Sequence, residues 1–371
     1  MKLAIVVVHY RTPELAAECV AAFRASLGSC GLEARLLLID NGSDAAGRAL
    51  LAGLPAELIE PGENLGFAGG VNLGVAKAFA NFGADVAVVA NPDVLVRPGC
   101  LGALIEELER GAAVAGPLFT WDRGGRMLLP PPERRTRRDE LRAALARHGG
   151  RWAERARSHW RQHARRHWQA EHPLATPWLS GGLLALRREA WAAVGPFDPG
   201  YRLYFEETDW LLRLVRRGLE ARLVPAARAV HLHAQSALSE PSAPEWFEAS
   251  AIRFRRRWYG AGFERLLAAA GRGEAPPEAL PPFPAAGLDL SALAVERPLW
   301  VEVSPAMAGF PAAAERIDRL DRMAAPWRLP AEIAERLPAG CWVVQVSDVR
   351  GREVGRWVLA GPMAGEGGEG S

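Results

Sequence analysis

Near its N-terminus the chain reads Leu3-Ala4-Ile5-Val6-Val7-Val8-His9-Tyr10-Arg11-Thr12-Pro13-Glu14. The run 3–9 is rich in β-branched and other apolar residues, which is typical of a strand. Thr12 and Pro13 then supply an N-cap and a proline for the first helical turn, and Glu14 places an acid near the positive end of the helix dipole. The segment therefore predicts a strand that leads directly into a helix.

Similar runs recur through the first third of the chain, separated by amphipathic helical stretches. The strand-like runs span 3–9, 35–40, 57–60, 84–90 and 113–118. Strands that alternate with helices form a largely parallel sheet with helices on both faces. We therefore expect an α/β fold with a Rossmann-like sheet over this region.

The composition is that of an ordinary globular protein. Of the 371 residues, 49% are hydrophobic and 24% are charged, and this length predicts a principal domain with a smaller one. The net charge of +2 is too small to indicate nucleic acid, and we expect no such partner. The longest apolar stretch falls short of the 18 residues of a membrane span, so any membrane contact is expected to be peripheral.

The four cysteines indicate a reducing environment. Cys19, Cys30, Cys100 and Cys341 lie far apart, without the C-x-x-C or Cys/His spacing of a zinc site. They are typical of reduced thiols in a cytoplasmic protein. We expect a cytoplasmic location, which includes the inner face of the plasma membrane.

The pattern changes in the middle of the chain. Residues 133–172 are a polar helical stretch rich in Arg and Trp, which we expect to be an insertion into a first domain of residues 1–271. Prolines concentrate in 272–288 and predict a linker. The strand-like runs that follow predict a small β-rich module at 289–361, with a disordered tail at 362–371.

Polar side chains follow the first two strands, at the sheet edge where α/β folds bind ligands. His9-Tyr10-Arg11 stands in place of a G-x-G-x-x-G turn, which disfavours a dinucleotide site. The second strand ends in Asp40 and Asn41, a carboxylate and an amide suited to hydrogen-bonding a nucleobase or ribose. Residues 40–43 (Asp-Asn-Gly-Ser) are equally typical of a simple turn, so that alternative stays open.

The next two connections add a glycine-rich loop and another carboxylate. Residues 64–72 (Asn-Leu-Gly-Phe-Ala-Gly-Gly-Val-Asn) allow close approach of the backbone to a nucleotide, and a helix N-terminus that could face an anion follows. Asp93, in the run 91–93, is placed where a divalent cation could join it to diphosphate oxygens, although Asn-Pro-Asp is more often only a turn. The candidate nucleotide-binding residues of these connections are Asn64, Gly66, Phe67, Asn72 and Asn91.

In combination, the four strand ends resemble family 2 glycosyltransferases of the GT-A fold, especially the rhamnosyltransferase-like branch. The likeness covers roughly residues 3–260. It continues in the segments Trp178-Leu179-Ser180-Gly181-Gly182, Arg187 to Asp198 and Tyr204-Phe205-Glu206-Glu207-Thr208-Asp209-Trp210. The resemblance implies a GT-A type, nucleotide-binding mixed sheet and the inverting transfer of a sugar from a UDP-, GDP- or dTDP-linked donor.

The resemblance also implies roles for single positions. Asp40 would contact the base or ribose, and Asp93 corresponds to the last residue of a D-x-D metal motif in which Asn91 replaces the first acid. His231 corresponds to the histidine of an H-x-x-G-x-S element, with Ala234 in place of glycine, and would help to hold Mn²⁺ or Mg²⁺ or the diphosphate. The residues implied in acceptor binding are Trp178, Gly181 and Gly182.

An acidic cluster supplies the candidate catalytic base. Residues 205–209 (Phe-Glu-Glu-Thr-Asp) resemble the family's F-E-D-x-D motif, with Glu207 where aspartate is usual. Glu207 would take the proton of the acceptor hydroxyl as its oxygen attacks the anomeric carbon. Glu206 and Asp209 complete the candidate catalytic set. From the residues alone, three acids in a first turn could equally be favourable partners of the helix dipole.

Several roles stay open at this point. The basic segment 151–166 predicts either a solvated helix face or contact with anionic headgroups or a pyrophosphate-lipid acceptor. The β-rich module could bind carbohydrate or mediate oligomerisation. We predict a polysaccharide or lipid-linked glycan acceptor in the cell envelope. The alternatives are a non-catalytic nucleotide-sugar or glycan-binding protein and a sugar-phosphate nucleotidyltransferase, against which the run 9–12 argues.

Overall fold

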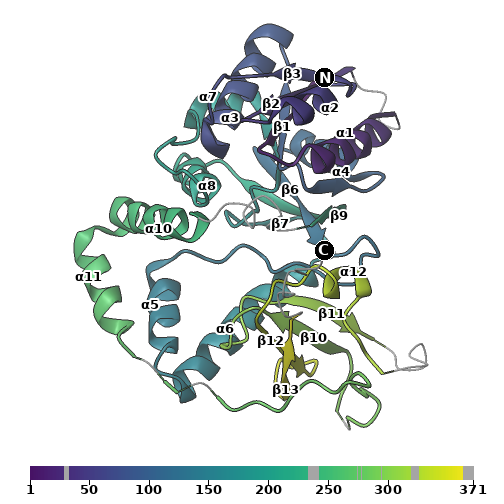
Figure 1. Cartoon of the computed structure of the whole chain (residues 1–371). Helices are drawn as coiled ribbons and strands as arrows, with labels where there is room; N and C mark the ends of the chain where they lie inside the picture. The colour runs from purple at the N-terminus through teal and green to yellow at the C-terminus, as the bar shows by residue number, and fades with distance from the viewer. Residues whose placement is uncertain are drawn as a thin grey trace, which may run out of the picture. The chain divides into compact units, whose positions relative to one another are not determined.

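The computed structural model describes residues 1–28, 33–232, 242–273, 275–276, 278–293, 295–318 and 326–361. The chain divides into two compact units, each with its own sheet (Figure 1). Unit 1 comprises Met1–Phe119 and Gln169–Glu264, and unit 2 comprises Thr120–Trp168 and Arg265–Ser371. The predicted tail 362–371 lies outside the described residues.

Unit 1 is built on one mixed sheet. Its strands are β1 (Lys2–His9), β2 (Glu33–Asp40), β3 (Glu57–Ile59), β4 (Val86–Ala90), β5 (Val94–Val96), β6 (Val114–Thr120), β7 (Leu174–Ala175), β8 (Leu183–Arg187) and β9 (Ala221–His231). They lie in the order β3-β2-β1-β4-β8-β6-β9-β5, and β7 pairs with β9. β1 runs parallel to β2 and β4, whereas β8 runs antiparallel to β4. The carboxyl ends of β1, β2 and β4 therefore meet at one edge.

Helices flank this sheet. They are α1 (Pro13–Gly28), α2 (Ala45–Ala52), α3 (Gly66–Lys77) with the π-helical turn η1 (Ala78–Phe82), α4 (Cys100–Glu109), α7 (Arg188–Val194), α8 (Glu206–Arg216) and α10 (Ala243–Tyr259). The next helix, α11 (Ala261–Ala270), begins in unit 1 and ends in unit 2. α3 lies close against β1, because a Cβ on Gly74 would come within 2.2 Å of Val6 Cγ1 and one on Gly70 within 2.6 Å of Val8 Cγ1. Gly70, which belongs to the predicted nucleotide loop 64–72, and Gly74, which follows that loop, therefore serve helix packing.

The described part of unit 2 has a small antiparallel sheet accompanied by helices. They are β10 (Leu299–Ser304), β11 (Ala313–Ile317), β12 (Cys341–Ser347), β13 (Glu353–Ala360), α5 (Arg137–Ala146), α6 (Gly150–Trp168) and α12 (Ala331–Ala334). The strand order is β11-β10-β12-β13, and neighbouring strands pair in antiparallel fashion. Apolar side chains of these strands, such as Val301 and Val344, pack around Trp327 in a core of their own.

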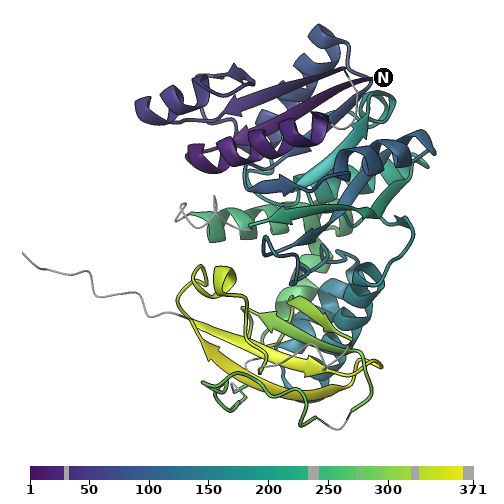
Figure 2. The ribbon, with the colours of Figure 1, turned by 90° about the vertical axis from the view of Figure 1, so that its right-hand side faces the viewer.

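The Arg- and Trp-rich segment packs on this small sheet. Trp168 of α6 stacks on Trp300 of β10 with ring centroids 5.3 Å apart. Arg161 Nε donates to the Glu302 carboxylate over 2.7 and 3.0 Å, and both side chains are buried. In Figure 2 the yellow-green strands lie beside the teal helix α6. Residues 133–168 therefore group with the C-terminal strands, not with the first domain into which we expected them to be inserted.

This packing limits the predicted solvated helix face to one side of α6. One side of α6 is buried by indoles and by arginines whose charges are paired inside unit 2. Arg151, Arg155 and Arg166 stay exposed on the other side, so the prediction of headgroup contact is confined to them. Every helix in the described part of the chain is too short or too polar to cross a bilayer. The helix-flanked mixed sheet and the small β-sheet confirm the predicted fold class.

Candidate functional site

The ends of β1 and β2 are joined by a short chain of hydrogen bonds. His9 Nε2 lies 2.9 Å from Ser43 Oγ, and that hydroxyl donates to Asp40 Oδ1 over 2.8 Å. The N–H groups of Gly42 and Ser43 donate to the same oxygen over 3.1 and 2.9 Å. Since the single proton of Ser43 is given to Asp40, His9 Nε2 must carry the proton that it shares with Ser43. The turn at 40–43, which the sequence offered as an alternative, is thus present, and Asp40 Oδ1 accepts its hydrogen bonds.

His9 supports this turn from inside the protein. Its side chain is fully buried, and burial lowers its pKa although the nearby Asp40 acts in the opposite direction. A neutral imidazole without solvent access cannot touch the nucleotide-sugar donor. We therefore revise His9 from a predicted donor ligand to a residue that supports the turn. Tyr10 and Arg11 are more accessible, and the guanidinium of Arg11 lies 5.0 Å from the centre of the Tyr10 ring. These two remain candidates for donor contact.

The glycine-rich loop is tied to the end of β2. Asn41 Nδ2 donates to the carbonyl oxygen of Gly66 over 3.0 Å, and Asn64 Oδ1 accepts from the Gly66 N–H over 2.9 Å. Gly66 has a φ of +69°, a conformation that favours glycine. Asn41 Oδ1 is buried and has no partner among the described residues. The structure therefore brings these predicted donor residues together and leaves one amide oxygen unbonded.

Asn72 has a different position from the one predicted. Its Nδ2 donates to the carbonyl oxygen of Phe197 over 2.9 Å, and its Oδ1 accepts from the Phe197 N–H over 2.9 Å. Both polar ends of the amide are therefore used to hold α3 against the segment before α8. We revise Asn72 from a donor ligand to a structural contact. Phe67, which is half-buried, remains a candidate for donor contact.

The two predicted metal ligands lie side by side. His231 Nε2 is 3.2 Å from Asp93 Oδ1, and both side chains are nearly buried. The arrangement follows from the sheet, because Val94 of β5 pairs with His231 of β9 and the Leu232 N–H donates to the Asp93 carbonyl over 3.0 Å. Within the described ranges, no third His, Cys, Asp or Glu joins them in a metal-sized group. His233 and Ala234 lie outside the described residues.

A pair of glycines separates the acidic cluster from this imidazole. A Cβ on Gly181 would lie 3.2 Å from Glu207 Cγ, and one on Gly182 would lie 2.9 Å from His231 Cε1. The Gly182 carbonyl also accepts from the Asn91 N–H over 3.0 Å. The backbone at 181–182 therefore passes directly between the candidate base and the candidate metal ligand. Trp178, the third predicted acceptor residue, is half-buried just before it.

The three acids at the start of α8 have different surroundings. Glu206 is buried, its Oε2 has no partner in the described chain, and burial followed by the charge of Glu207 raises its pKa well above the usual value. Glu207 is half-buried and faces the glycine pair. The raised pKa favours the protonated form of Glu206, which makes Glu207 the better candidate for the base. The N-cap, Phe205, makes no side-chain capping bond.

Asp209 is a structural residue. It is fully buried and accepts hydrogen bonds from Arg213 Nε over 2.9 Å and from Trp258 Nε1 over 2.9 Å. Arg257 Nε lies a further 3.1 Å from Oδ1. A carboxylate held in this way has no free position for a substrate proton. We therefore revise its predicted catalytic role to that of anchoring α8 to α10.

The raised pKa of Glu206 leads to a prediction about stability. A buried carboxyl with a raised pKa keeps its proton in the folded state after the unfolded chain has lost it, so its contribution to the free energy of unfolding falls as the pH rises above about 4.3. Glu206→Gln replaces the carboxyl group by an amide that does not titrate, so this fall in the free energy of unfolding does not occur. We expect the melting temperature to exceed that of the natural protein at pH 7 by about 2–4 °C, the effect of roughly 1 kcal/mol, and to equal it at pH 4. Thermal unfolding at both pH values tests this, and equal melting temperatures at pH 7 would contradict it.

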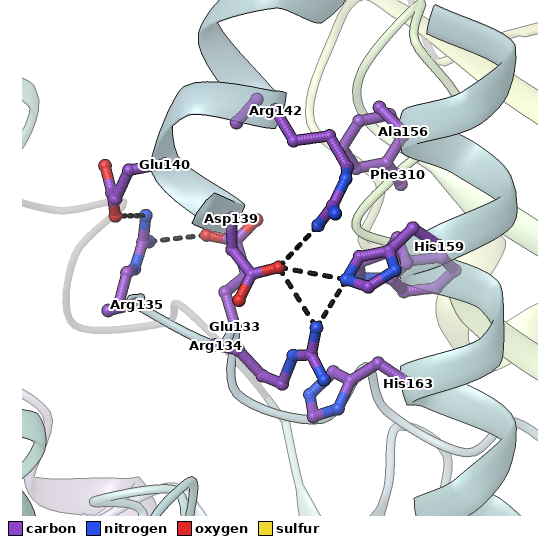
Figure 3. A pocket seen from close by; sticks show the side chains of 12 residues that line it. Glu133, Arg134, Arg135, Asp139, Glu140, Arg142, Ala156, His159, His163 and Phe310 are labelled. Atoms are coloured by element: carbon purple, nitrogen blue, oxygen red, sulfur yellow. Dashed lines mark hydrogen bonds and ion pairs between the residues drawn. The ribbon is translucent and has the colours of Figure 1, made fainter. Parts of the chain in front are cut away.

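Unit 2 contains a small pocket of its own, with a cavity of about 60 Å³ (Figure 3). At its centre Asp139 Oδ1 accepts from Arg142 Nη1 over 2.8 Å and lies 2.9 Å from His159 Nε2. Arg134 contacts both Asp139 and His159. The charges in this pocket are therefore paired with one another, and nothing in it resembles the acidic site of unit 1.

Comparison with known proteins identifies the family. Residues 4–170 match the family described as Glycosyl transferase family 2. The chain is also 32% identical over 218 residues to the N-acetylglucosaminyl-diphospho-decaprenol L-rhamnosyltransferase of Mycobacterium tuberculosis, in strain CDC 1551 / Oshkosh and in strain ATCC 25618 / H37Rv. This match covers 56% of the chain and 69% of the relative. The chain belongs to glycosyl transferase family 2.

Solved structures of glycosyltransferases were also matched. One is the crystal structure of GalNAc-T7 with UDP, GalNAc and Mn²⁺, at 16% identity and a TM-score of 0.38, where the match covers 62% of this chain and 43% of that one. Another is a mannosyltransferase from Pyrobaculum calidifontis in complex with GDP-Man and Mn²⁺, at 16% identity and a TM-score of 0.41, covering 74% and 76%. The roles of single residues in this family 2 glycosyltransferase therefore rest on its own geometry.

Sequence reasoning missed two residues of the site. Ser43 links His9 to Asp40 through hydrogen bonds, whereas its sequence pattern indicates only a turn. Tyr204 stands just before the acids with a φ of +64°, and the following Phe205 has a φ of +71°. Tyrosine and phenylalanine carry no sequence signal for this backbone conformation.

Proposed function

We propose that this family 2 glycosyltransferase moves a sugar from a nucleotide diphosphate donor to a glycan hydroxyl, with inversion at the anomeric carbon and Glu207 as the base. The observation that carries the proposal is the position of residues 181–182 between Glu207 and His231. This arrangement puts a half-buried carboxylate on one side of a backbone without side chains, and a carboxylate–imidazole pair on the other. In a single displacement, the acceptor hydroxyl attacks the anomeric carbon from the side opposite the departing diphosphate. The acceptor and the diphosphate would therefore lie on opposite sides of that carbon.

The chemical step uses Glu207 as the proton acceptor. Glu207 takes the proton from the acceptor hydroxyl, and the hydroxyl oxygen forms a bond to the anomeric carbon. The bond from that carbon to the diphosphate oxygen breaks, and its electron pair leaves with the nucleotide diphosphate. Burial and the charge of Glu207 raise the pKa of Glu206, which favours its protonated form, so Glu207 is the better proton acceptor of the two.

The pair Asp93 and His231 fits a divalent cation in part. A carboxylate oxygen and an imidazole nitrogen 3.2 Å apart are suitable first ligands for Mn²⁺, and a carboxylate alone suits Mg²⁺. Since the described residues provide no third ligand, the diphosphate of the donor would complete the coordination. Such an ion, when bound, supplies positive charge that stabilises the departing diphosphate.

Donor and acceptor classes follow from the relative and from the site. The nucleotide would contact Asp40, the unbonded amide oxygen of Asn41 and the loop at Gly66. The named substrate of the mycobacterial relative is a diphospho-decaprenol glycan, which supports a lipid-linked acceptor and a rhamnosyl or other hexosyl donor. Membership of this family sets the nucleotidyltransferase alternative aside.

The experiment is a donor screen with purified protein. UDP-, GDP- and dTDP-linked sugars, L-rhamnose among them, are incubated with and without Mn²⁺ or Mg²⁺, and nucleotide release is followed together with thermal shift. We expect one donor to stabilise the protein and to be hydrolysed slowly without acceptor and faster with a short-chain N-acetylglucosaminyl diphosphate lipid. Stabilisation without release under either condition would instead support the non-catalytic nucleotide-sugar-binding protein, and no stabilisation by any donor would contradict the donor site.

A further inference from the structure

Two exposed aromatic rings stand next to the acidic cluster. Tyr204 and Phe247 are each 37% exposed, which is unusual for aromatic side chains in this chain. They meet edge to face with ring centroids 5.5 Å apart, although one precedes α8 and the other lies on α10. Beside them, the Arg202 guanidinium covers the Trp246 ring at 4.4 Å. Contiguous exposed aromatic surface at the edge of a reaction site is typical of a binding surface.

The backbone holds Tyr204 in this place against its conformational preference. Tyr204 and Phe205 are consecutive residues with left-handed φ values of +64° and +71°. Phe205 points into a buried cluster, where Tyr201, Ala251 and Phe254 surround it. The packing of Phe205 in this cluster holds the turn in its strained conformation. The turn directs the Tyr204 ring outward beside Glu206 and Glu207. Strain of this kind persists where the surrounding structure enforces it and is concentrated at functional sites.

We propose that Tyr204 and Phe247 form a stacking platform for a pyranose ring of the acceptor. The inference rests on the proposed function and deepens it, because it names the part of the acceptor that the site recognises. The platform adjoins the carboxylate that accepts the proton, so a ring stacked there presents a hydroxyl group toward Glu207. It also explains why two large aromatic rings remain exposed at this point of unit 1.

The chemistry of the surroundings favours a sugar over an alkyl chain. A pyranose has an apolar C–H face and a polar rim, which matches an aromatic face bordered by carboxylates. Burial raises the pKa of Tyr204, and coulombic interactions with Glu206, Asp93 and Glu207 raise it further, so the phenol keeps its proton and can donate it to a sugar oxygen. An alkyl chain would bury this phenol and the carboxylates without hydrogen bonds, which is unfavourable.

The test measures binding of two probes to the full chain by calorimetry or ligand-observed NMR. The sugar probe is N-acetylglucosamine 1-phosphate, and the alkyl probe is decyl diphosphate. We expect Phe247→Leu and Tyr204→Gly to weaken binding of the sugar probe about threefold to tenfold each and to leave the alkyl probe unchanged. Phe247→Trp keeps an aromatic face and should bind the sugar probe as the natural protein does. Val215→Ala, which removes a similarly exposed apolar side chain from α8, is the matched control and should change neither affinity.

Tyr204→Gly also separates binding from folding. Glycine relieves the left-handed strain, so the variant should melt at or above the temperature of the natural protein while its sugar affinity falls. The inference is overturned if the natural protein does not bind the sugar probe, if both variants bind it unchanged, or if only the alkyl probe is weakened. Suppose that a nucleotide-sugar donor stabilises the protein and its nucleotide is released, while both variants bind the sugar probe unchanged. The proposed function then stands and the stacking platform is ruled out.

Discussion

Replacing Glu207 by glutamine is expected to lower kcat for sugar transfer by about 10³-fold, because a general base contributes roughly 10²–10⁴-fold to such a step. Glutamine keeps the size and polarity of the side chain beside Gly181, so the contact between them persists. Only the ability to accept the proton is lost. The Kd for the nucleotide-sugar donor should stay within about twofold. The measurement is single-turnover transfer at saturating donor and acceptor.

Glu206→Gln is the matched control for this experiment. The variant changes the adjacent carboxyl in the same way, but at a position where the natural side chain is buried and burial raises its pKa. We expect it to retain kcat within about a factor of ten. If Glu206→Gln were the inactive variant and Glu207→Gln the active one, the assignment of the base would be reversed.

Removal of the Asp93 carboxylate should produce the second large effect. Asp93→Ala is expected to lower turnover on the order of a hundredfold and to abolish its response to added Mn²⁺ or Mg²⁺, since a bound cation supplies several kcal/mol of charge stabilisation. Mn²⁺ binding to the protein–donor complex, followed by electron paramagnetic resonance, gives a readout that does not depend on turnover. His231→Gln should weaken the same signal to a smaller extent. Natural Mn²⁺ affinity in Asp93→Ala would contradict the placement of the cation.

The sequence predicted the parallel part of the sheet well, because local pattern and burial agree there. The runs 3–9 and 35–40 correspond to β1 and β2 to within two residues at each end. The sequence did not predict that α6 belongs to unit 2, since this depends on which surface its indoles and arginines contact. Trp168 and Arg161 contact Trp300 and Glu302, which are more than 130 residues further along the chain, and no local pattern reports such a partner.

The candidate site shows the same limit at the level of single side chains. The motifs singled out Asp93, His231 and Glu207, and the structure brings the first two together and sets Glu207 against the neighbouring glycine pair. Their roles stay predictions. Motif spacing could not distinguish a polar residue that faces a ligand from one that bonds to its own protein. Asn72 and Asp209 both belong to the second kind, and only their hydrogen-bond partners reveal it.

The most direct test of the central claim is the anomeric configuration of the product. The donor found by the screen is reacted with an acceptor, and the new linkage is read by NMR before any hydrolysis or isomerisation. A single displacement, with Glu207 as base opposite the diphosphate, predicts a product of inverted configuration formed by the natural protein and not by Glu207→Gln. A product that retains the configuration of the donor would contradict this account.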